Sequence, residues 1–160
     1  MRDLGDDARM LEPVRPISVD IPDGPVVVLG DESRLRQLLT NLLGNVRRHT
    51  EPRAACALHV RPTETDVLIT VADRGGGMNP DDAAHAFDRF YRADASRNRD
   101  SGGSGLGLSI AKAIVDAHGG EIALDTGINA GTRVTIRLPR AHRDVPARDP
   151  RPELTPAPRG

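Results

Sequence analysis

Two asparagines beside an apolar repeat are the first residues of this chain whose types and spacing suit a ligand. Asn41 and Asn45 lie four residues apart and share one side of the predicted helix with Arg48 and His49. Asparagine competes for backbone hydrogen bonds and is a poor residue for a helix interior. Its amide oxygen suits a hard cation such as Mg²⁺, which often binds phosphates as well. The pattern fits either a solvated polar flank or a lip that faces a ligand.

An aspartate stands at the end of a predicted strand, directly before a glycine-rich turn. Asp73 is followed by Arg74, Gly75, Gly76 and Gly77. In one interpretation, Asp73 makes only a local Asx hydrogen bond within this turn. In the other, its carboxylate accepts a hydrogen bond from an amino group, and the glycines let a flat ligand such as a purine come close. The sequence leaves both interpretations open.

A second glycine-rich run leads directly into an apolar helical repeat. Residues 101–107 hold four glycines, and residues 106–115 then supply apolar side chains at helical spacing. Such a run exposes backbone N–H groups at the positive end of the helix dipole, which favours phosphate. The GxGxxG spacing of dinucleotide-binding folds is absent, because Leu108 and Ile110 occupy the places of the third glycine.

A sheet and two helices are needed to hold these residues together. Asp31 suits the N-cap of a helix that continues to about Thr50, and Gly119 and Gly120 suit the end of a second helix. We expect helices at residues 31–50 and 106–118 and strands at residues 26–29, 54–61, 66–72, 121–125 and 133–138. One apolar face per strand and two amphipathic helices predict an α+β fold, in which helices cover one face of a mixed sheet.

The composition narrows the possible function classes. The 160 residues carry a formal charge of −1, which removes the basic footprint of a dedicated nucleic-acid binder. The single Cys56 permits neither an internal disulfide nor a cysteine-based zinc site. The only lysine, Lys112, precedes Ala113, which excludes a Walker-type phosphate loop. No apolar run approaches the roughly 18–20 residues that span a bilayer.

Five motifs occur in one order along residues 17–139, and together they resemble the ATP-binding catalytic domain of two-component sensor histidine kinases. That domain belongs to a wider superfamily with gyrase, Hsp90-type chaperones and mismatch-repair ATPases. The motifs are DESRLRQLLTNLLGNVRRHT at residues 31–50, DRGGGM at 73–78, FDRFYR at 87–92, GSGLGLSIAK at 103–112 and GT at 131–132. They resemble, in turn, the N, G1, F and G2 boxes and the closing Gly-Thr element of the family, whose fold is an α/β sandwich with a mostly antiparallel sheet.

The resemblance implies a role for each matched position. Asn45 corresponds to the Mg²⁺-coordinating asparagine, Arg48 to a position near the phosphates and Arg92 to an arginine beside the transferred phosphate, so that these three are expected to be catalytic. Asp73 corresponds to the acceptor of the adenine amino group, and His49 to a ring that packs against adenine. The expected ATP-binding residues are Asn41, Asn45, Arg48, His49, Asp73, Gly75, Gly77, Met78, Tyr91, Gly103, Ser104, Gly105, Leu106, Gly107, Leu108 and Thr132.

The chain is expected to have three parts. The resemblance implies that residues 1–16 are a linker or edge segment from a missing dimerisation domain, that residues 17–139 are the catalytic domain, and that a mobile lid covers the nucleotide at about residues 79–104. Residues 140–160 are rich in Pro and Arg and are expected to be a disordered tail.

The resemblance also implies partners. They are the helical phosphoacceptor domain of a homodimeric parent kinase and the cognate response regulator. The formal charge of −1 leads us to expect no nucleic acid as a partner. The parent is expected in the plasma membrane, with this domain cytoplasmic and monomeric on its own. None of the five histidines has the His-Glu/Asp-x-x-x-Pro setting of the phosphoacceptor, which we therefore expect outside this chain.

One matched position separates a kinase from a hydrolase. The ATPase relatives place a glutamate four residues before the metal-binding asparagine, where it activates water, and this chain has Asn41 there. A neutral amide is a poor base, whereas transfer to a histidine on another domain relies on positioning and charge neutralisation. The resemblance therefore favours a histidine kinase with ATP and Mg²⁺ as cofactors. A hydrolysing ATPase and a nucleotide-free docking module remain as alternatives.

Overall fold

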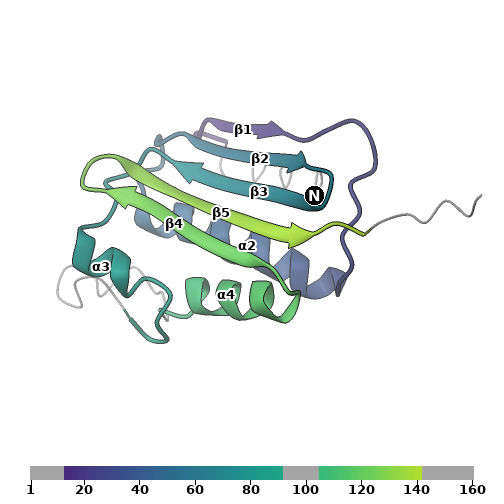
Figure 1. Cartoon of the computed structure of the whole chain (residues 1–160). Coiled ribbons are helices and arrows are strands. Elements are labelled where there is room, and N and C mark those ends of the chain that lie inside the picture. The colour runs from purple at the N-terminus through teal and green to yellow at the C-terminus, as the bar shows by residue number, and fades with distance from the viewer. Residues whose placement is uncertain (1–12, 92–104, 142–160) are drawn as a thin grey trace, which may run out of the picture.

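A five-stranded sheet packed against two helices forms the chain, of which a computed structural model describes residues 13–91 and 105–141 (Figure 1). The strands are β1 (Ile17–Asp20), β2 (Cys56–Pro62), β3 (Asp66–Asp73), β4 (Glu121–Gly127) and β5 (Gly131–Pro139). The helices are α2 (Glu32–His49), the short α3 (Pro80–Ala84) and α4 (Gly107–Ala117). Across the sheet the strands follow the order β1-β2-β3-β5-β4.

The sheet is mixed and mostly antiparallel. β1 runs parallel to β2, and the other neighbouring strands are antiparallel. In the centre β3 pairs with β5, so that Asp73 at the end of β3 lies opposite Thr132 near the start of β5. The predicted α+β class, with a mixed and mostly antiparallel sheet, is confirmed.

Helix α2 is the longest element and carries the two asparagines. Its N-cap is Asp31, whose side chain accepts the amide hydrogens of Ser33 at 2.8 Å and Arg34 at 3.1 Å. The Ser33 hydroxyl, followed by the Arg34 amide, lowers the pKa of Asp31. Burial of each large apolar side chain stabilises the fold by about 1.5–3 kcal/mol. The buried side chains of α2 are Leu38, Leu39, Leu42 and Val46.

The alternation of the strands directs their apolar side chains toward the helices. The strand residues of the core are Cys56, Leu58, Val60, Val67, Ile69, Val71, Val134, Ile136 and Leu138. Helix α4 adds Ala111, Ile114 and Val115 to the same cluster. Because α2 and α4 share one core with these strand faces, both helices cover the same side of the sheet.

The strand predicted at residues 26–29 is not formed, and this prediction was wrong. Of these residues only Val28 pairs, in an isolated antiparallel bridge with Arg140 just beyond β5. Val26 and Val28 are partly buried against the core, whereas Val27 and Leu29 are exposed, so that only alternate residues of the apolar run contribute to the core. The preceding Pro25 has no amide hydrogen to extend a ladder. The first strand is β1, an edge strand that we did not predict.

Part of the predicted lid is described. Asn79 caps α3 by accepting the Asp82 amide hydrogen at 2.8 Å, and the described chain continues to Tyr91. The other half of the lid, residues 92–104, lies outside the described residues. The expected linker and tail lie largely in residues 1–12 and 142–160, which are also outside them, so the division into three parts stays a prediction. In the two described ranges, no helix combines the length and apolarity needed to cross a membrane.

Candidate functional site

Helix α2 places Asn45 against the first turn of α4. The contact is close because Gly107, the first residue of α4, has no side chain. A Cβ atom at Gly107 would lie 2.6 Å from Oδ1 and 3.2 Å from Nδ2 of Asn45, so that only glycine allows this approach. The polar side of α2 and Gly107, the last residue of the second glycine-rich run, are far apart in the sequence and meet here.

The start of α4 presents backbone amides without a side-chain cap. Gly105 has a φ of +66°, a left-handed conformation that glycine adopts without strain. Leu106 at the N-cap makes no side-chain hydrogen bond to the helix. The first amides of a helix have no intrahelical acceptor and lie at the positive end of its dipole. This arrangement suits phosphate oxygens, although Gly103 and Ser104 of the predicted site lie outside the described residues.

The second amide on α2, that of Asn41, is buried and unpaired. Its Nδ2 atom is shielded from solvent and has no hydrogen-bond partner in the part of the chain that the structure describes. A buried donor without a partner costs about 1–3 kcal/mol, and native proteins keep few of them. Asn41 lies one helical turn before Asn45 on the same side of α2. The amide therefore has an unused donor, and because it is shielded, a ligand oxygen would reach it only if a neighbouring group moves.

The two cationic candidates on α2, Arg48 and His49, are exposed at the C-terminal end of the helix. The Nε atom of Arg48 donates to the backbone oxygen of Gly44 at 3.1 Å, so the guanidinium group lies back along the helix. The role of Arg48 near phosphates and that of His49 beside a base stay predictions.

The carboxylate of Asp73 is fixed at the exit of β3. Its Oδ1 atom accepts the amide hydrogen of Gly75 at 2.8 Å, so the local Asx interaction is formed. A Cβ atom at Gly75 would lie 2.4 Å from Cγ2 of Thr50 and 2.9 Å from Oδ1 of Asp73, so the turn packs tightly on the end of α2. Within the described residues no hydrogen bond uses Oδ2 of Asp73, which leaves this oxygen as an acceptor for a ligand.

The C-terminal half of α2 borders both parts of the candidate site. Asn45 contacts Gly107, and Thr50 contacts Gly75. Five residues of a helix correspond to about 7.5 Å along its axis. A nucleoside triphosphate is long enough to reach from one contact to the other. The structure thus places the acid at the strand end and the start of α4 against the same helix, α2. That these groups bind one ligand stays a prediction.

The glycine-rich turn after Asp73 is locked against the turn between β4 and β5. Gly77 has a φ of +66°, and a Cβ atom there would lie 1.9 Å from the carbonyl oxygen of Gly127. Gly131 has a φ of +77°, and a Cβ atom there would lie 2.1 Å from the carbonyl oxygen of Asp73. Both glycines are therefore required by backbone packing, whatever they contribute to a ligand.

Thr126 in β4, which the sequence did not indicate, completes this packing. Its Oγ1 atom accepts the amide hydrogen of Met78 at 3.0 Å and donates to the backbone oxygen of Gly131 at 2.9 Å. The hydroxyl of Thr132, a predicted ATP-binding residue, lies 3.2 Å from the same atom. Threonine is an ordinary strand residue, so its presence in β4 carried no signal.

Two predicted site residues, Leu108 and Tyr91, contact parts of the protein other than the groups described above. Leu108 is partly buried and packs against the core. The hydroxyl of Tyr91 donates to Oδ1 of Asp82 at 2.7 Å, and this hydrogen bond raises the pKa of Tyr91. The ring of Tyr91 also lies 5.3 Å from that of His85, which ties Tyr91 to the region of α3. Arg92, the third predicted catalytic residue, lies outside the described residues.

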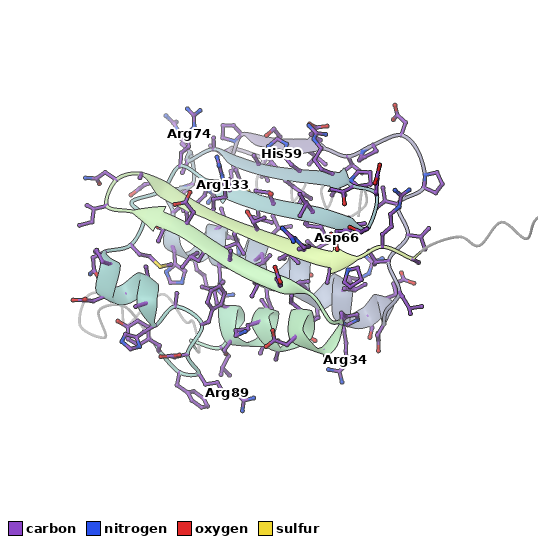
Figure 2. All side chains as sticks on the ribbon, in the orientation of Figure 1. Arg34, His59, Asp66, Arg74, Arg89 and Arg133 are labelled. Atoms are coloured by element: carbon purple, nitrogen blue, oxygen red, sulfur yellow. The ribbon has the colours of Figure 1, made fainter. Side chains whose placement is uncertain are left out.

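A groove of about 840 Å³ lies on the open face of the sheet, and Asp73 at the end of β3 is part of its lining. Its lining includes His59, Arg74 and Arg133, which Figure 2 labels. His59 and Arg133 alternate with buried residues of β2 and β5, so they point away from the two long helices. This groove is therefore not the place where α2 meets α4.

Comparison with known proteins identifies a family. Residues 30–142 match the family described as histidine kinase-, DNA gyrase B-, and HSP90-like ATPase. The chain is 39% identical over 137 residues to the probable sensor histidine kinase TcrY of Mycobacterium tuberculosis. It is 40% identical over 123 residues to the signal transduction histidine-protein kinase BaeS of Escherichia coli. These matches cover 86% and 77% of this chain but 29% and 26% of the relatives, so the chain spans less than a third of their length.

Solved structures agree with these relatives. The mycobacterial sensor histidine kinase MprB has a TM-score of 0.74 and 28% identity, over 87% of this chain and 91% of that chain. Full-length ShkA, in complex with AMPPNP, has a TM-score of 0.70 and 28% identity, over 85% of this chain and 29% of that chain. The predicted resemblance to the catalytic domain of sensor histidine kinases is confirmed. The chain belongs to the family of histidine kinase-, DNA gyrase B- and HSP90-like ATPases.

Proposed function

We propose that this chain binds ATP with Mg²⁺ and transfers the γ-phosphate to a histidine on a separate dimerisation domain of a sensor histidine kinase. The observation that carries the proposal is the contact between Asn45 and Gly107 beside the uncapped start of α4. An amide oxygen for a hard cation and a set of helix amides in one place suit a magnesium-bound triphosphate. The relatives, which are named as sensor histidine kinases, support the same function.

At the phosphate end, three groups of the chain have capacity for a ligand. The amides at the start of α4 would donate to phosphate oxygens, and Nδ2 of Asn41 would gain the acceptor that it lacks. Oδ1 of Asn45 is the proposed protein ligand of Mg²⁺, which would neutralise phosphate charge when bound. The two described ranges contain no cluster of three or more His, Cys, Asp or Glu side chains suited to a metal ion. Arg48 and Arg92 are the proposed cationic residues near the transferred phosphate.

At the adenine end, Asp73 is the proposed acceptor of the adenine amino group. Its Oδ1 atom is held by the Gly75 amide, which leaves Oδ2 for the base. Gly75 and Gly77 are proposed to line the base and ribose. Thr132 lies opposite Asp73 in the sheet. His49 is the proposed ring beside adenine. Gly103, Gly105, Leu106 and Gly107 are proposed to form the turn that binds the phosphates, and Met78, Tyr91, Ser104 and Leu108 are the remaining proposed contacts.

The proposed phosphate acceptor is a histidine and not water. The residue one turn before Asn45 is Asn41, and an amide does not deprotonate water. Positioning of the triphosphate and neutralisation of its charge then account for catalysis. A hydrolysing ATPase is the second candidate, which the family name keeps open. Steady release of phosphate by the chain without an acceptor would favour that candidate.

The partners of the whole protein are proposed from relatives of which this chain spans less than a third. We propose a homodimeric parent that carries the phosphoacceptor domain and acts on a cognate response regulator. The parent would lie in the plasma membrane with this domain on the cytoplasmic side. The isolated domain is proposed to be a monomer that does not bind nucleic acid.

Calorimetric titration with ATP tests the proposed site. We expect the wild-type chain to bind ATP with Mg²⁺, and Asp73→Asn to abolish binding because an amide NH₂ would face the adenine amino group. Asn45→Ala should weaken binding only when Mg²⁺ is present. Asp66→Asn, at the other end of β3, is the matched control and should bind normally. Unchanged affinity in Asp73→Asn or Asn45→Ala would count against the assignment.

A further inference from the structure

A buried arginine lies next to the adenine end of the proposed site. The Arg15 side chain is held by Thr50 and Ala54: its Nη1 atom donates to the Thr50 hydroxyl at 2.7 Å and to the Ala54 backbone oxygen at 2.9 Å. Arg15 is only 6% exposed. Removing a guanidinium group from water is unfavourable unless hydrogen bonds compensate for it. Arg15 is therefore a fixed link between the start of the described chain and the end of α2.

The hydroxyl of Thr50 takes part in two hydrogen bonds. The hydroxyl accepts a hydrogen bond from Arg15 and donates one to the backbone oxygen of Val46 at 2.7 Å. A β-branched side chain has few rotamers, and these two bonds select one of them. In that rotamer the Cγ2 methyl packs on Gly75, where a Cβ atom would lie 2.4 Å away. Thr50 thus forms the wall against which the turn after β3 rests.

Gly75, which rests on Thr50, also holds the carboxylate of Asp73. The Gly75 amide donates to Oδ1 of Asp73 at 2.8 Å. The Arg74 amide donates to the backbone oxygen of Ala55 at 3.0 Å, directly after the second residue that Arg15 holds. Both residues that follow Asp73 therefore rest on the segment that Arg15 fixes.

We propose that Arg15 is a positioning residue of the nucleotide site, which places the Asp73 carboxylate through Thr50 and thereby sets the preference for adenine. The inference rests on the proposed function, because it takes Asp73 as the acceptor of the adenine amino group. Arg15 itself does not touch the nucleotide. Guanine carries a carbonyl oxygen where adenine carries this amino group, so the position of one carboxylate oxygen decides the ratio of the affinities for ATP and GTP.

Competition binding of ATP and GTP to Arg15→Ala is the direct test. We expect the Kd for ATP to rise about tenfold, which corresponds to a weakened hydrogen bond to a charged group, with the Kd for GTP unchanged. A purely structural effect would lower the folded fraction and weaken the binding of both nucleotides by the same factor. The ratio of the two Kd values would then stay constant. Arg53→Ala is the matched control, because Arg53 is an exposed arginine in the same segment between α2 and β2. It should change neither Kd.

Substitutions of Thr50 separate its hydroxyl from its methyl group. Thr50→Val keeps the shape and removes the hydroxyl, so it should lower the ATP preference as Arg15→Ala does. The double variant should then be no worse than either single one, because both changes break the same link. Thr50→Ser keeps the hydroxyl but loses the methyl that contacts Gly75, and it should also lower the preference. In Arg15→Lys, the lysine side chain can donate to one of the two acceptors, so this variant should keep part of the preference for ATP over GTP.

An unchanged ratio of ATP to GTP affinity in Arg15→Ala would overturn the proposal, as would additive losses in the double variant. If circular dichroism shows that Arg15→Ala does not fold, Thr50→Val and Thr50→Ser decide the same question. Wild-type ratios in both of these variants would then overturn it. Failure of the wild-type chain to bind ATP would instead overturn the proposed function, so the two failures are distinguishable.

Discussion

The two ends of the proposed nucleotide site are built differently, although α2 borders both. At the adenine end, the turn after Asp73 packs backbone to backbone on the turn between β4 and β5, and a side-chain hydroxyl bonds to both turns. At the phosphate end, the Asn45 side chain rests on the bare Cα of Gly107. There the start of α4 has no side-chain cap and the amide of Asn41 has no partner within the described residues.

This difference shows that the adenine end is fully formed without a ligand, whereas the phosphate end is not. The adenine end is preorganised, because its tightly packed glycines and the fixed carboxylate are held by neighbouring strands. The phosphate end keeps polar groups whose hydrogen bonds are not made, at a cost of about 1–3 kcal/mol for one buried donor. Stability should therefore depend mostly on the adenine end, and the response to a ligand mostly on the phosphate end.

Gly77→Ala should produce the largest change, at the adenine end. The added Cβ would lie 1.9 Å from a backbone oxygen, and the φ of +66° disfavours alanine. We expect the free energy of unfolding in urea to fall by about 3 kcal/mol. Gly76→Ala is the control, since a Cβ there meets nothing within 4 Å. Equal stability of these two variants would remove the claim that this turn is locked.

Asn41→Leu should produce a smaller change, of opposite sign, at the phosphate end. Replacing an unpaired buried amide by an apolar group of similar size should stabilise the ligand-free chain by about 1 kcal/mol. ATP binding should weaken in the same variant, because the donor for a ligand oxygen is gone. Thr40→Val, at an exposed neighbour on α2, controls for the helix itself. A destabilised variant that binds ATP normally would mean that Asn41 serves the fold and not the ligand.

The fold could be predicted where local patterns decide it. Asp31 and the leucines of α2 specify that helix by themselves, because capping and helical spacing act within a few residues. The strand predicted from Val26 to Leu29 was wrong, because Val26 and Val28 are partly buried there without pairing beyond one bridge. β1 was missed because it is a short edge strand, and its parallel pairing with β2 joins segments distant in the sequence.

The site could be predicted as motifs but not as contacts. The types and spacing of Asn45 and Asp73 predict a ligand-binding role, which stays a prediction, whereas the contact of Asn45 with Gly107 depends on how α2 packs on α4. Thr126 and Arg15 were missed for the same physical reason. Arg15 stands in a proline-rich stretch without periodicity, and its acceptors lie more than thirty residues away.

Calorimetric titration of Gly107→Ala with ATP and Mg²⁺ tests the proposed site most directly. The new Cβ would lie 2.6 Å from Oδ1 of Asn45 and would displace the amide that is proposed to bind Mg²⁺. Gly44→Ala adds the same atom to α2, where it meets only the flexible end of Arg48 at 3.0 Å. We predict that both variants fold, that Gly44→Ala keeps wild-type affinity and that Gly107→Ala loses at least about tenfold. Wild-type affinity in Gly107→Ala would contradict a triphosphate site between α2 and α4.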